Sequence, residues 1–236
     1  MALTAGPGRR RRRAWQVAGA AAAAALACGC LTVDDRTLTV KPSPIDISNF
    51  ENVALQPADP RFDAWQYAAY NSDAPTVIAA VVSPGFNSGW CLSIDWQVTD
   101  APDGALNYPG VLLRTAINGS IDLNPYESVV FAHRYQNTGT CMALQNVIVR
   151  FLCRQVQFGF EKYVPVSYVW QMLSINFADL EEVPYLRQML LDTQQDVPTK
   201  EACLAVVDEV QFLAQGDLQD GQCSSGELQL DDISIR

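Results

Sequence analysis

The chain ends with the stretch "GELQLDDISIR" (residues 226–236), which indicates a β-strand with an irregular register. Its two leucines alternate with polar residues, and its two isoleucines do the same, as expected of a strand with one buried face. The two pairs lie on opposite parities, so all four side chains face one core only if the register shifts between them. That shift falls on Asp231 and Asp232. The sequence therefore predicts a terminal strand with a β-bulge at two adjacent carboxylates.

Similar short runs recur along the chain. They are rich in β-branched and aromatic residues, and clusters of Gly, Pro, Asn and Asp separate them, which predicts strands. The ten runs are 45–52, 64–71, 76–83, 91–98, 110–117, 128–135, 146–153, 166–177, 207–215 and 227–235. Between 178 and 204 the pattern changes to helical spacing, so one short helix is expected near 183–194. Ten strands and one helix predict an all-β protein with a two-sheet β-sandwich.

Alternation within the strands separates a core face from an outer face. In the run 91–98 the even positions are apolar, whereas the odd positions carry Ser93, Asp95 and Gln97. The other clear strands alternate in the same way. Each predicted sheet thus has an apolar inner face and an outer face with isolated polar groups, as in two packed antiparallel sheets.

The start of the chain resembles an export signal. Five arginines at 9–13 precede "AWQVAGAAAAAALAC", an apolar segment shorter than the roughly 20 residues that span a bilayer. We therefore expect a cleaved signal and no membrane helix. The small residues before Cys28 resemble a bacterial lipoprotein signal, in which Cys28 becomes the lipidated first residue. Cys30 is the alternative lipidation site, and an ordinary secretory signal is the alternative type.

The expected organisation follows from this signal. It is a signal peptide at 1–27, a polar linker at 28–43 and one large all-β domain at 44–236. A lipid on Cys28 would anchor the protein to the bacterial cell envelope, with no other contact with the membrane.

Charge separates the signal from the domain. The chain has 16 basic and 26 acidic residues, and five of the basic residues belong to the signal. The remaining 11 basic residues leave a strongly acidic domain. Such a surface repels nucleic acid and anionic membrane faces, so we expect neutral or cationic partners and no nucleic acid.

Cysteine usage fits an exported protein. Six cysteines follow Cys28, without a C-x-x-C motif and with only one histidine in the chain, so disulfides are favoured over a zinc site. Cys203 and Cys223 bracket one compact segment and are the first predicted pair. Cys91 with Cys141 is the second. Cys141 and Cys153 are expected near opposite ends of one strand, too far apart to pair.

The order of the motifs resembles that of the jelly-roll carbohydrate-binding modules and related galactose-binding-like domains. The chain runs from "ISNFEN" (47–52) through "DLNPYESVVFAHR" (122–134) and "VWQMLSINFADL" (169–180) to the final "ELQLDDISI" (227–235). Members of this family open with a Phe-Glu pair, carry an Asp-x-x-x-Tyr turn before a strand and finish with Asp-Asp-Ile or Asp-Asp-Val. The resemblance spans residues 44–236 and implies a jelly-roll fold, which the helical segment 178–204 interrupts.

The resemblance also implies a structural calcium ion. In many relatives an aspartate of the last strand and a glutamate near the first strand help to hold it. The matching residues are Glu51 and Asp231, with Asp232 as the competing choice. Several oxygen ligands suit a hard cation, and a bulge lets neighbouring residues converge on one point. Both aspartates could instead be solvated at a strand end.

The leading functional hypothesis is carbohydrate binding without catalysis. Sugar sites need hydrogen-bonding side chains on a rigid surface and an aromatic ring against apolar C–H groups. The predicted ligand-binding residues lie on outer faces, with one tryptophan on a loop: Trp90, Asp95, Gln97, Arg114, Arg134, Arg150 and Gln211. The other strand tryptophans, Trp65, Trp96 and Trp170, are expected in the core. The alternative is a protein-binding or scaffold module in a cell-surface complex, because one fold serves many functions.

An enzyme is not expected. His133 is the only histidine, and it alternates with apolar residues in a strand. The chain has neither a G-x-S-x-G elbow nor an H-E-x-x-H helix. A serine triad or a histidine-rich metal site is therefore disfavoured, although acids far apart in the sequence, such as Asp95, Glu181 and Glu209, could still converge.

Overall fold

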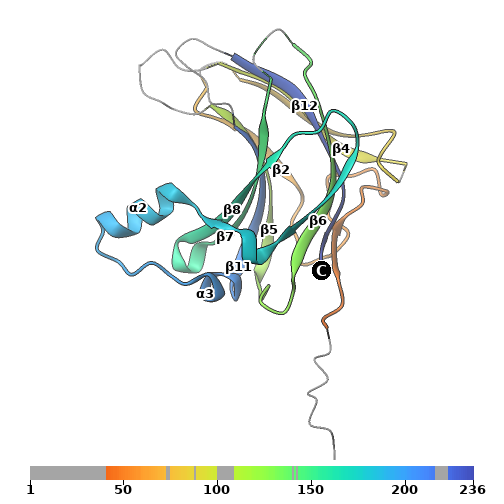
Figure 1. The fold of residues 1–236 in the computed structure, drawn as a ribbon. Coiled ribbons are helices and arrows are strands. Elements are labelled where there is room, and N and C mark those ends of the chain that lie inside the picture. Colours follow the sequence, from red (N-terminus) through yellow and green to blue (C-terminus); the bar gives the residue numbers. More distant parts are fainter. Residues whose placement is uncertain are drawn as a thin grey trace, which may run out of the picture. The chain divides into compact units, whose positions relative to one another are not determined.

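The computed structural model describes residues 41–72, 75–87, 89–99, 109–139, 141, 143–215 and 223–236. These residues form two antiparallel six-stranded sheets that pack face to face (Figure 1). The prediction of an all-β, two-sheet sandwich is therefore confirmed. The predicted signal peptide, most of the linker, Cys28 and Cys30 lie outside the described residues. Within the described part, no helix is long and apolar enough to span a bilayer.

The first sheet, sheet I, has the strand order β3-β4-β12-β6-β9, and β1 also pairs with β12. Its strands are β1 (Ile45–Ser48), β3 (Thr76–Val82), β4 (Cys91–Thr99), β6 (Ser128–Gln136), β9 (Gln171–Asn176) and β12 (Cys223–Ile235). The second sheet, sheet II, has the order β10-β8-β7-β11-β5-β2. Its strands are β2 (Gln66–Tyr70), β5 (Gly110–Ile121), β7 (Asn146–Cys153), β8 (Phe158–Pro165), β10 (Glu181–Glu182) and β11 (Val207–Gln215).

The helices lie in the segment where the strand pattern fails. α2 (Pro184–Asp192) confirms the predicted helical insertion, and its proline occupies the first turn, where a missing N–H costs nothing. α3 (Lys200–Leu204) is an additional short helix, capped by the Thr199 hydroxyl, which accepts from the Ala202 N–H at 3.2 Å. Two 3-10 turns complete the elements, η1 (Arg154–Val156) and η2 (Phe177–Asp179).

Each of the ten predicted strands has a counterpart, but β8 and β10 were not predicted. β8 follows a tight turn at Gln157, which has a positive φ of 53°. Its adjacent charged residues Glu161 and Lys162 interrupt the apolar alternation. The predicted run 166–177 is shorter in the structure, where only β9 is a strand.

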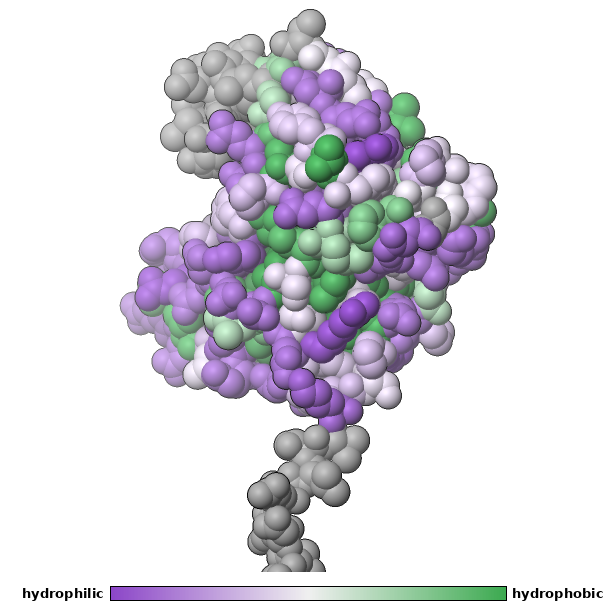
Figure 2. Space-filling model, turned by 45° about the vertical axis from the view of Figure 1, so that its right-hand side comes forward, coloured by the Kyte–Doolittle hydropathy of each residue, from purple (hydrophilic) through white to green (hydrophobic). Residues whose placement is uncertain are grey.

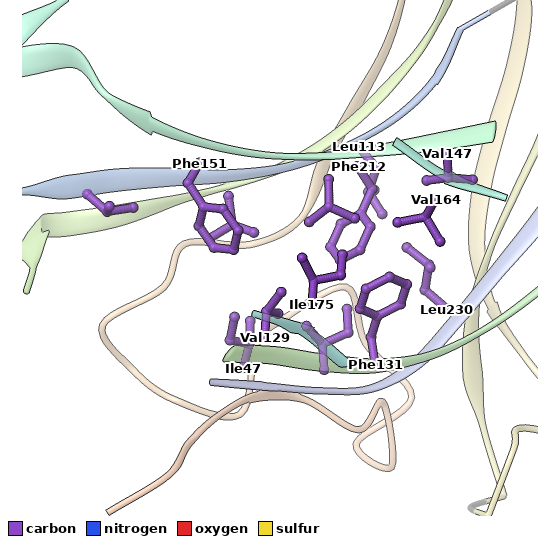
Figure 3. Packing of buried hydrophobic residues seen from close by; sticks show 14 of the residues in the cluster. Ile47, Leu113, Val129, Phe131, Val147, Phe151, Val164, Ile175, Phe212 and Leu230 are labelled. Atoms are coloured by element: carbon purple, nitrogen blue, oxygen red, sulfur yellow. The ribbon is translucent and has the colours of Figure 1, made fainter. Parts of the chain in front are cut away.

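The core lies between the two sheets. In Figure 3, side chains of sheet I such as Phe131 and Leu230 point toward side chains of sheet II such as Phe212 and Val147. The rings of Phe131 and Phe212 meet edge to face, with centroids 5.2 Å apart. Trp65 and Trp96 are buried in this core, as predicted.

The terminal strand carries the predicted irregularity. β12 pairs with β4 up to Leu230 and with β1 from Ile233 onward. Its register against β6 shifts between Asp231 and Ser234, and Asp232 has a left-handed φ of 49°. The shift lets both leucines and both isoleucines of the stretch face the core, where each is at most 1% exposed. One long strand thereby joins both halves of sheet I.

The predicted disulfide pairing was wrong. Cys203 does not pair with Cys223; it pairs with Cys153, at a Cα–Cα distance of 5.5 Å. Cys223 pairs with Cys141, and Cys91 is a free, buried thiol rather than the partner of Cys141. The reason is the direction of β11, whose nine residues span about 30 Å and carry the chain away from Cys203.

Candidate functional site

Five strands of sheet II place hydrogen-bonding side chains side by side on its outer face. Arg114 of β5 lies opposite Gln66 of β2 and Gln211 of β11. Gln211 in turn lies opposite Arg150 of β7, which lies opposite Glu161 of β8. We call these five residues the polar row. It crosses the sheet at right angles to the strands, because register pairs share a face.

Three members of the polar row are buried although they point away from the sandwich core, whereas Gln66 is exposed and Arg114 is partly exposed. Arg150, Glu161 and Gln211 are 8%, 2% and 6% exposed. Two apolar residues of the same face, Ile148 and Leu213, are also buried but do not belong to the core cluster. The part of the outer face formed by β7, β8 and β11 is therefore shielded from water, as parts of binding sites are.

Charged side chains in and beside the polar row are paired. Arg150 Nε donates to Glu161 Oε2 at 2.8 Å, and a second guanidinium nitrogen lies 2.7 Å from the same oxygen. Arg114 donates twice to Gln66 Oε1, at 3.2 and 3.0 Å. Glu209, two residues before Gln211, pairs with Arg154. The two ion pairs hold Arg150, Glu161 and Glu209 in fixed positions before any ligand arrives.

Two exposed tyrosines flank the polar row. Tyr163 lies on the outer face of β8 and is 51% exposed, and Tyr185 of α2 is 56% exposed. The Arg150 guanidinium lies 5.4 Å from the Tyr185 ring centre, and Arg150 Nη1 donates to the Tyr185 hydroxyl at 3.5 Å. Burial raises the pKa of Tyr163, and the Glu161 charge raises it further. The helical insertion thus supplies one ring and the unpredicted strand the other.

Tyr70 closes the same face from β2. Burial raises the pKa of its hydroxyl, Arg150 acts in the opposite direction, and Tyr163, Glu161 and Tyr185 raise it further. Tyr70 therefore lies within electrostatic reach of the Arg150–Glu161 pair. The Tyr70 hydroxyl donates to Gln215 Oε1 at 3.4 Å.

The outer face of sheet I carries the predicted residues Asp95, Gln97 and Arg134. Arg134 donates to Gln229 Oε1 at 2.9 Å, and its guanidinium lies 5.2 Å from the Trp170 ring centre. Asp95 accepts from the Thr138 hydroxyl at 3.4 Å. The seven predicted ligand residues therefore do not form one site, since Arg114, Arg150 and Gln211 belong to sheet II.

Trp170 and Trp90 contribute no ring to the outer face of sheet II. Trp170 was expected in the core, but it is half-buried beneath Arg134 on the outside of sheet I, with Phe86 at a ring distance of 5.9 Å. The strand starts only at Gln171, so the residue before it is free to turn outward. Trp90 is half-buried and packs against the core cluster, so its ring belongs to neither outer face.

The residues matched to calcium ligands, Glu51, Asp231 and Asp232, lie close together and are called the carboxylate corner. Burial raises the pKa of Asp232, and the charges of Asp231 and Glu51 raise it further, while the Asn87 side chain lowers it. A cleft of about 340 Å³ opens beside this corner. Its lining is mostly polar: Asp46, Ser48, Asn49, Asn87, Met172, Asp232, Ile233, Ser234 and Arg236.

Backbone amides already occupy part of the carboxylate corner. Asp231 accepts from the Phe86 N–H and the Asp232 N–H, both at 2.8 Å, and Glu51 accepts from the Trp90 N–H at 3.1 Å. In the described part of the chain, no three His, Cys, Asp or Glu residues are arranged to hold a metal. The oxygens are of the kind that calcium prefers. The hydrogen bonds of these carboxylates also hold the backbone of Phe86 and Trp90.

Sequence reasoning missed several residues of the sheet II face. Gln66 and Tyr70 lie in the predicted run 64–71, and their outward register follows from its alternation; that of Tyr163 follows only once β8 is recognised as a strand. Glu161 was missed because β8 was missed. Tyr185 gave no signal, because nothing in a short amphipathic helix tells which sheet it covers.

Comparisons with known proteins show which fold the chain has. Neither a family model nor a curated protein sequence matches the chain. A family 11 carbohydrate-binding module of a cellulosomal cellulase from Clostridium thermocellum is similar in structure, with a TM-score of 0.50 and 13% identity over 82% of this chain and 94% of that one. A family 28 carbohydrate-binding module specific for non-crystalline cellulose has a TM-score of 0.50 and 12% identity, over 83% and 96%. The chain therefore has the jelly-roll β-sandwich fold of these modules.

Proposed function

We propose that this chain is a non-catalytic carbohydrate-binding module whose ligand site is the outer face of sheet II. The observation that carries the proposal is the polar row, five hydrogen-bonding side chains on five adjacent strands, with the exposed rings of Tyr163 and Tyr185 beside it. A sugar presents hydroxyl groups at its edge and C–H groups on its faces. Fixed polar groups and exposed rings match these two surfaces.

The pairing of the charges supports a binding role without chemistry. Glu161 and Glu209 are buried and each is held by an arginine, so neither is poised as a general acid or base. His133 is buried on the core side of sheet I, away from the polar row. The similarity of fold to two carbohydrate-binding modules is consistent with the proposal, although fold alone does not define a function.

The test is binding of neutral hexasaccharides of glucose, galactose, mannose and xylose, measured by calorimetry. Tyr163→Ala and Tyr185→Ala should each weaken binding roughly fivefold to tenfold, because each removes one ring contact of about 1 kcal/mol. Both rings are more than half exposed, so the folded state should survive. Tyr168→Ala is the matched control, since Tyr168 is 62% exposed and its ring packs on Tyr135 of sheet I.

Two results would contradict the proposal. If only Tyr168→Ala weakens binding, the site lies near sheet I. If a folded wild-type domain binds no sugar, the protein-binding or scaffold alternative takes its place. That alternative has a specific observation of its own: Figure 2 shows hydrophobic residues exposed among polar ones on one face, and Tyr168, Val169 and Met172 are exposed in or just before the edge strand β9.

The remaining elements of the proposal concern anchoring and metal. We propose that Cys28 is lipidated and anchors the domain to the bacterial envelope through the linker. Mass spectrometry of the mature chain tests the lipid, and Cys28→Ser should release the protein from membranes. We keep a structural calcium ion at the carboxylate corner as a proposal, tested by the melting temperature in calcium and in chelator.

A further inference from the structure

Both outer faces contain the same pair of side chains on one strand. Glu209 and Gln211 are two residues apart on β11, and Glu227 and Gln229 are two residues apart on β12. In each pair the glutamine Nε2 donates to the glutamate Oε1. Both glutamines are 6% exposed. The donor end of each amide is therefore used in the same way.

The acceptor ends differ. On sheet I, Gln229 Oε1 accepts two hydrogen bonds from Arg134, its register partner on β6. β9 ends its pairing with β6 at His133, so Arg134 has no register partner beyond it and turns back to the glutamine. The amide of Gln229 is satisfied within the protein.

On sheet II, Gln211 Oε1 is buried and has no hydrogen-bond partner among the residues that the structure describes. Two arginines lie opposite Gln211, but Arg114 is directed to Gln66 and Arg150 to Glu161, each on the far neighbouring strand. A buried acceptor without a donor destabilises a protein and is rare in native structures. Its position in the centre of the polar row offers a reason for keeping it.

We propose that Gln211 Oε1 is the specificity-determining acceptor of the sheet II site and receives a hydroxyl hydrogen of the sugar. This inference rests on the proposed function and adds the group that reads the ligand. A ligand that donates a hydrogen bond to this unpaired acceptor gains binding free energy, because the oxygen has no other donor to lose. A molecule without that donor leaves the oxygen unpaired.

The charges around Gln211 favour a neutral donor. The two buried carboxylates near Gln211, Glu161 and Glu209, are each paired with a guanidinium, of Arg150 and Arg154. The formal charges cancel within each pair, and the guanidinium of Arg114 is directed to the neutral Gln66. An ammonium donor would meet the arginines next to the amide, and a carboxylate or sulfate has no hydrogen to give. A hydroxyl donates to Gln211 and can also accept from an arginine.

A neighbouring side chain must move before a ligand reaches the enclosed oxygen. Arg114 is the least restrained neighbour: its side chain is 40% exposed, it donates to the neutral Gln66, and it lies 3.9 Å from Glu209. A hydroxyl that displaces the guanidinium takes its place beside Gln211. The Arg150 side chain, in contrast, is 10% exposed, and two of its three guanidinium nitrogens are held by Glu161.

The experiment compares Gln211→Met with the matched Gln229→Met, first without ligand. Gln229→Met should lower the melting temperature by several degrees, because Arg134 and Glu227 lose their partner. Gln211→Met should change it by no more than about 2 °C, because an unpaired oxygen is removed together with the hydrogen bond to Glu209. An equal, large drop in both variants would show that Gln211 Oε1 is satisfied within the protein and would overturn the inference.

The second measurement is calorimetry with the neutral hexasaccharide panel. Gln211→Met should bind about tenfold more weakly than wild type, and Gln229→Met should bind as wild type does. A deoxyfluoro analogue that lacks the donated hydrogen should bind poorly to wild type and no worse to Gln211→Met. Equal affinity of Gln211→Met and wild type overturns the inference and leaves carbohydrate binding intact. Absence of binding to folded wild type overturns the proposed function and the inference with it.

Discussion

The two outer faces of the sandwich carry similar residues but connect them by different hydrogen-bond networks. On sheet I, Arg134, Gln229 and Glu227 form a chain of hydrogen bonds that continues to the Ser93 hydroxyl, which donates at 2.6 Å. On sheet II the same residue types are present, but Arg114 donates to Gln66 and Arg150 donates to Glu161. Each of these partners lies on the neighbouring strand farther from Gln211. The first network is closed, and the second leaves one acceptor open.

Strand position explains the difference. Arg134 is near the edge of sheet I and has no register partner across β9, so it must bond inward. Arg114 and Arg150 flank the central strand β11 and have partners on both sides. The same residue types can therefore form a closed network or leave one acceptor open, depending on where the competing partners lie.

Loss of a disulfide should have the largest effect on stability. Its effect on sugar binding should differ between the two disulfides. Removing either Cys141–Cys223 or Cys153–Cys203 by paired alanine substitution should lower the free energy of unfolding by about 4 kcal/mol, since both close long loops, with separations of 82 and 50 residues. Only the second fastens the segment with α2 and Tyr185 to sheet II. Urea denaturation should show two similar losses, and calorimetry should show weaker sugar binding in the Cys153/Cys203 variant alone. Equal binding by both variants would contradict this division.

The next effect concerns the two arginines. Arg150→Ala should cost about 3 kcal/mol of stability, because it leaves Glu161, 2% exposed, as an unpaired buried charge. Arg134→Ala should cost about 1 kcal/mol, because only a neutral amide and a ring lose a partner. Urea denaturation measures both. The double variant Arg150→Met with Glu161→Leu should recover most of the loss; if it does not, the ion pair is not the cause.

The faces of each strand were readable from the sequence, but the assignment of strands to sheets was not. Alternation in 91–98 and 146–153 predicted which residues point outward, because a period of two persists wherever one face is buried. Arg134 and Arg150 therefore looked alike. Pairing between strands distant in sequence, such as β12 with β4 and β6, decides that they lie in different sheets.

The missed parts of the candidate site have a common physical origin. Glu161 is tolerated in β8 only because Arg150, eleven residues earlier, neutralises it, and no local pattern shows such a pair. The disulfides failed for the same reason, since Cys153 meets Cys203 through the packing of α3. By contrast, the bulge at Asp231 and Asp232 was predicted, because a change of parity is written in adjacent residues.

A smaller effect should come from the core between the faces. Burial lowers the pKa of His133, and the Pro165 carbonyl acts against this. The folded state then binds a proton at His133 less readily than the unfolded state does. The free energy of unfolding should therefore keep its full value above pH 6.5 and decline as the pH falls below 6.5. The urea midpoint of wild type should fall across this range. Since His133 is the only histidine, His133→Leu should remove that component, and an unchanged pH profile would contradict the assignment.

The smallest expected effect concerns the carboxylate corner. The question is whether these carboxylates bind only backbone N–H groups or also bind a metal ion. Asp232 has a left-handed φ of 49°, which asparagine tolerates well, and it lies beside the like charges of Asp231 and Glu51. In chelator, Asp232→Asn should therefore raise the melting temperature by about 1–2 °C. If the carboxylates of the corner also bind a calcium ion, added calcium should raise the melting temperature of wild type and not that of Asp232→Asn. If calcium changes neither, these carboxylates bind only backbone N–H groups, among them those of Phe86 and Trp90.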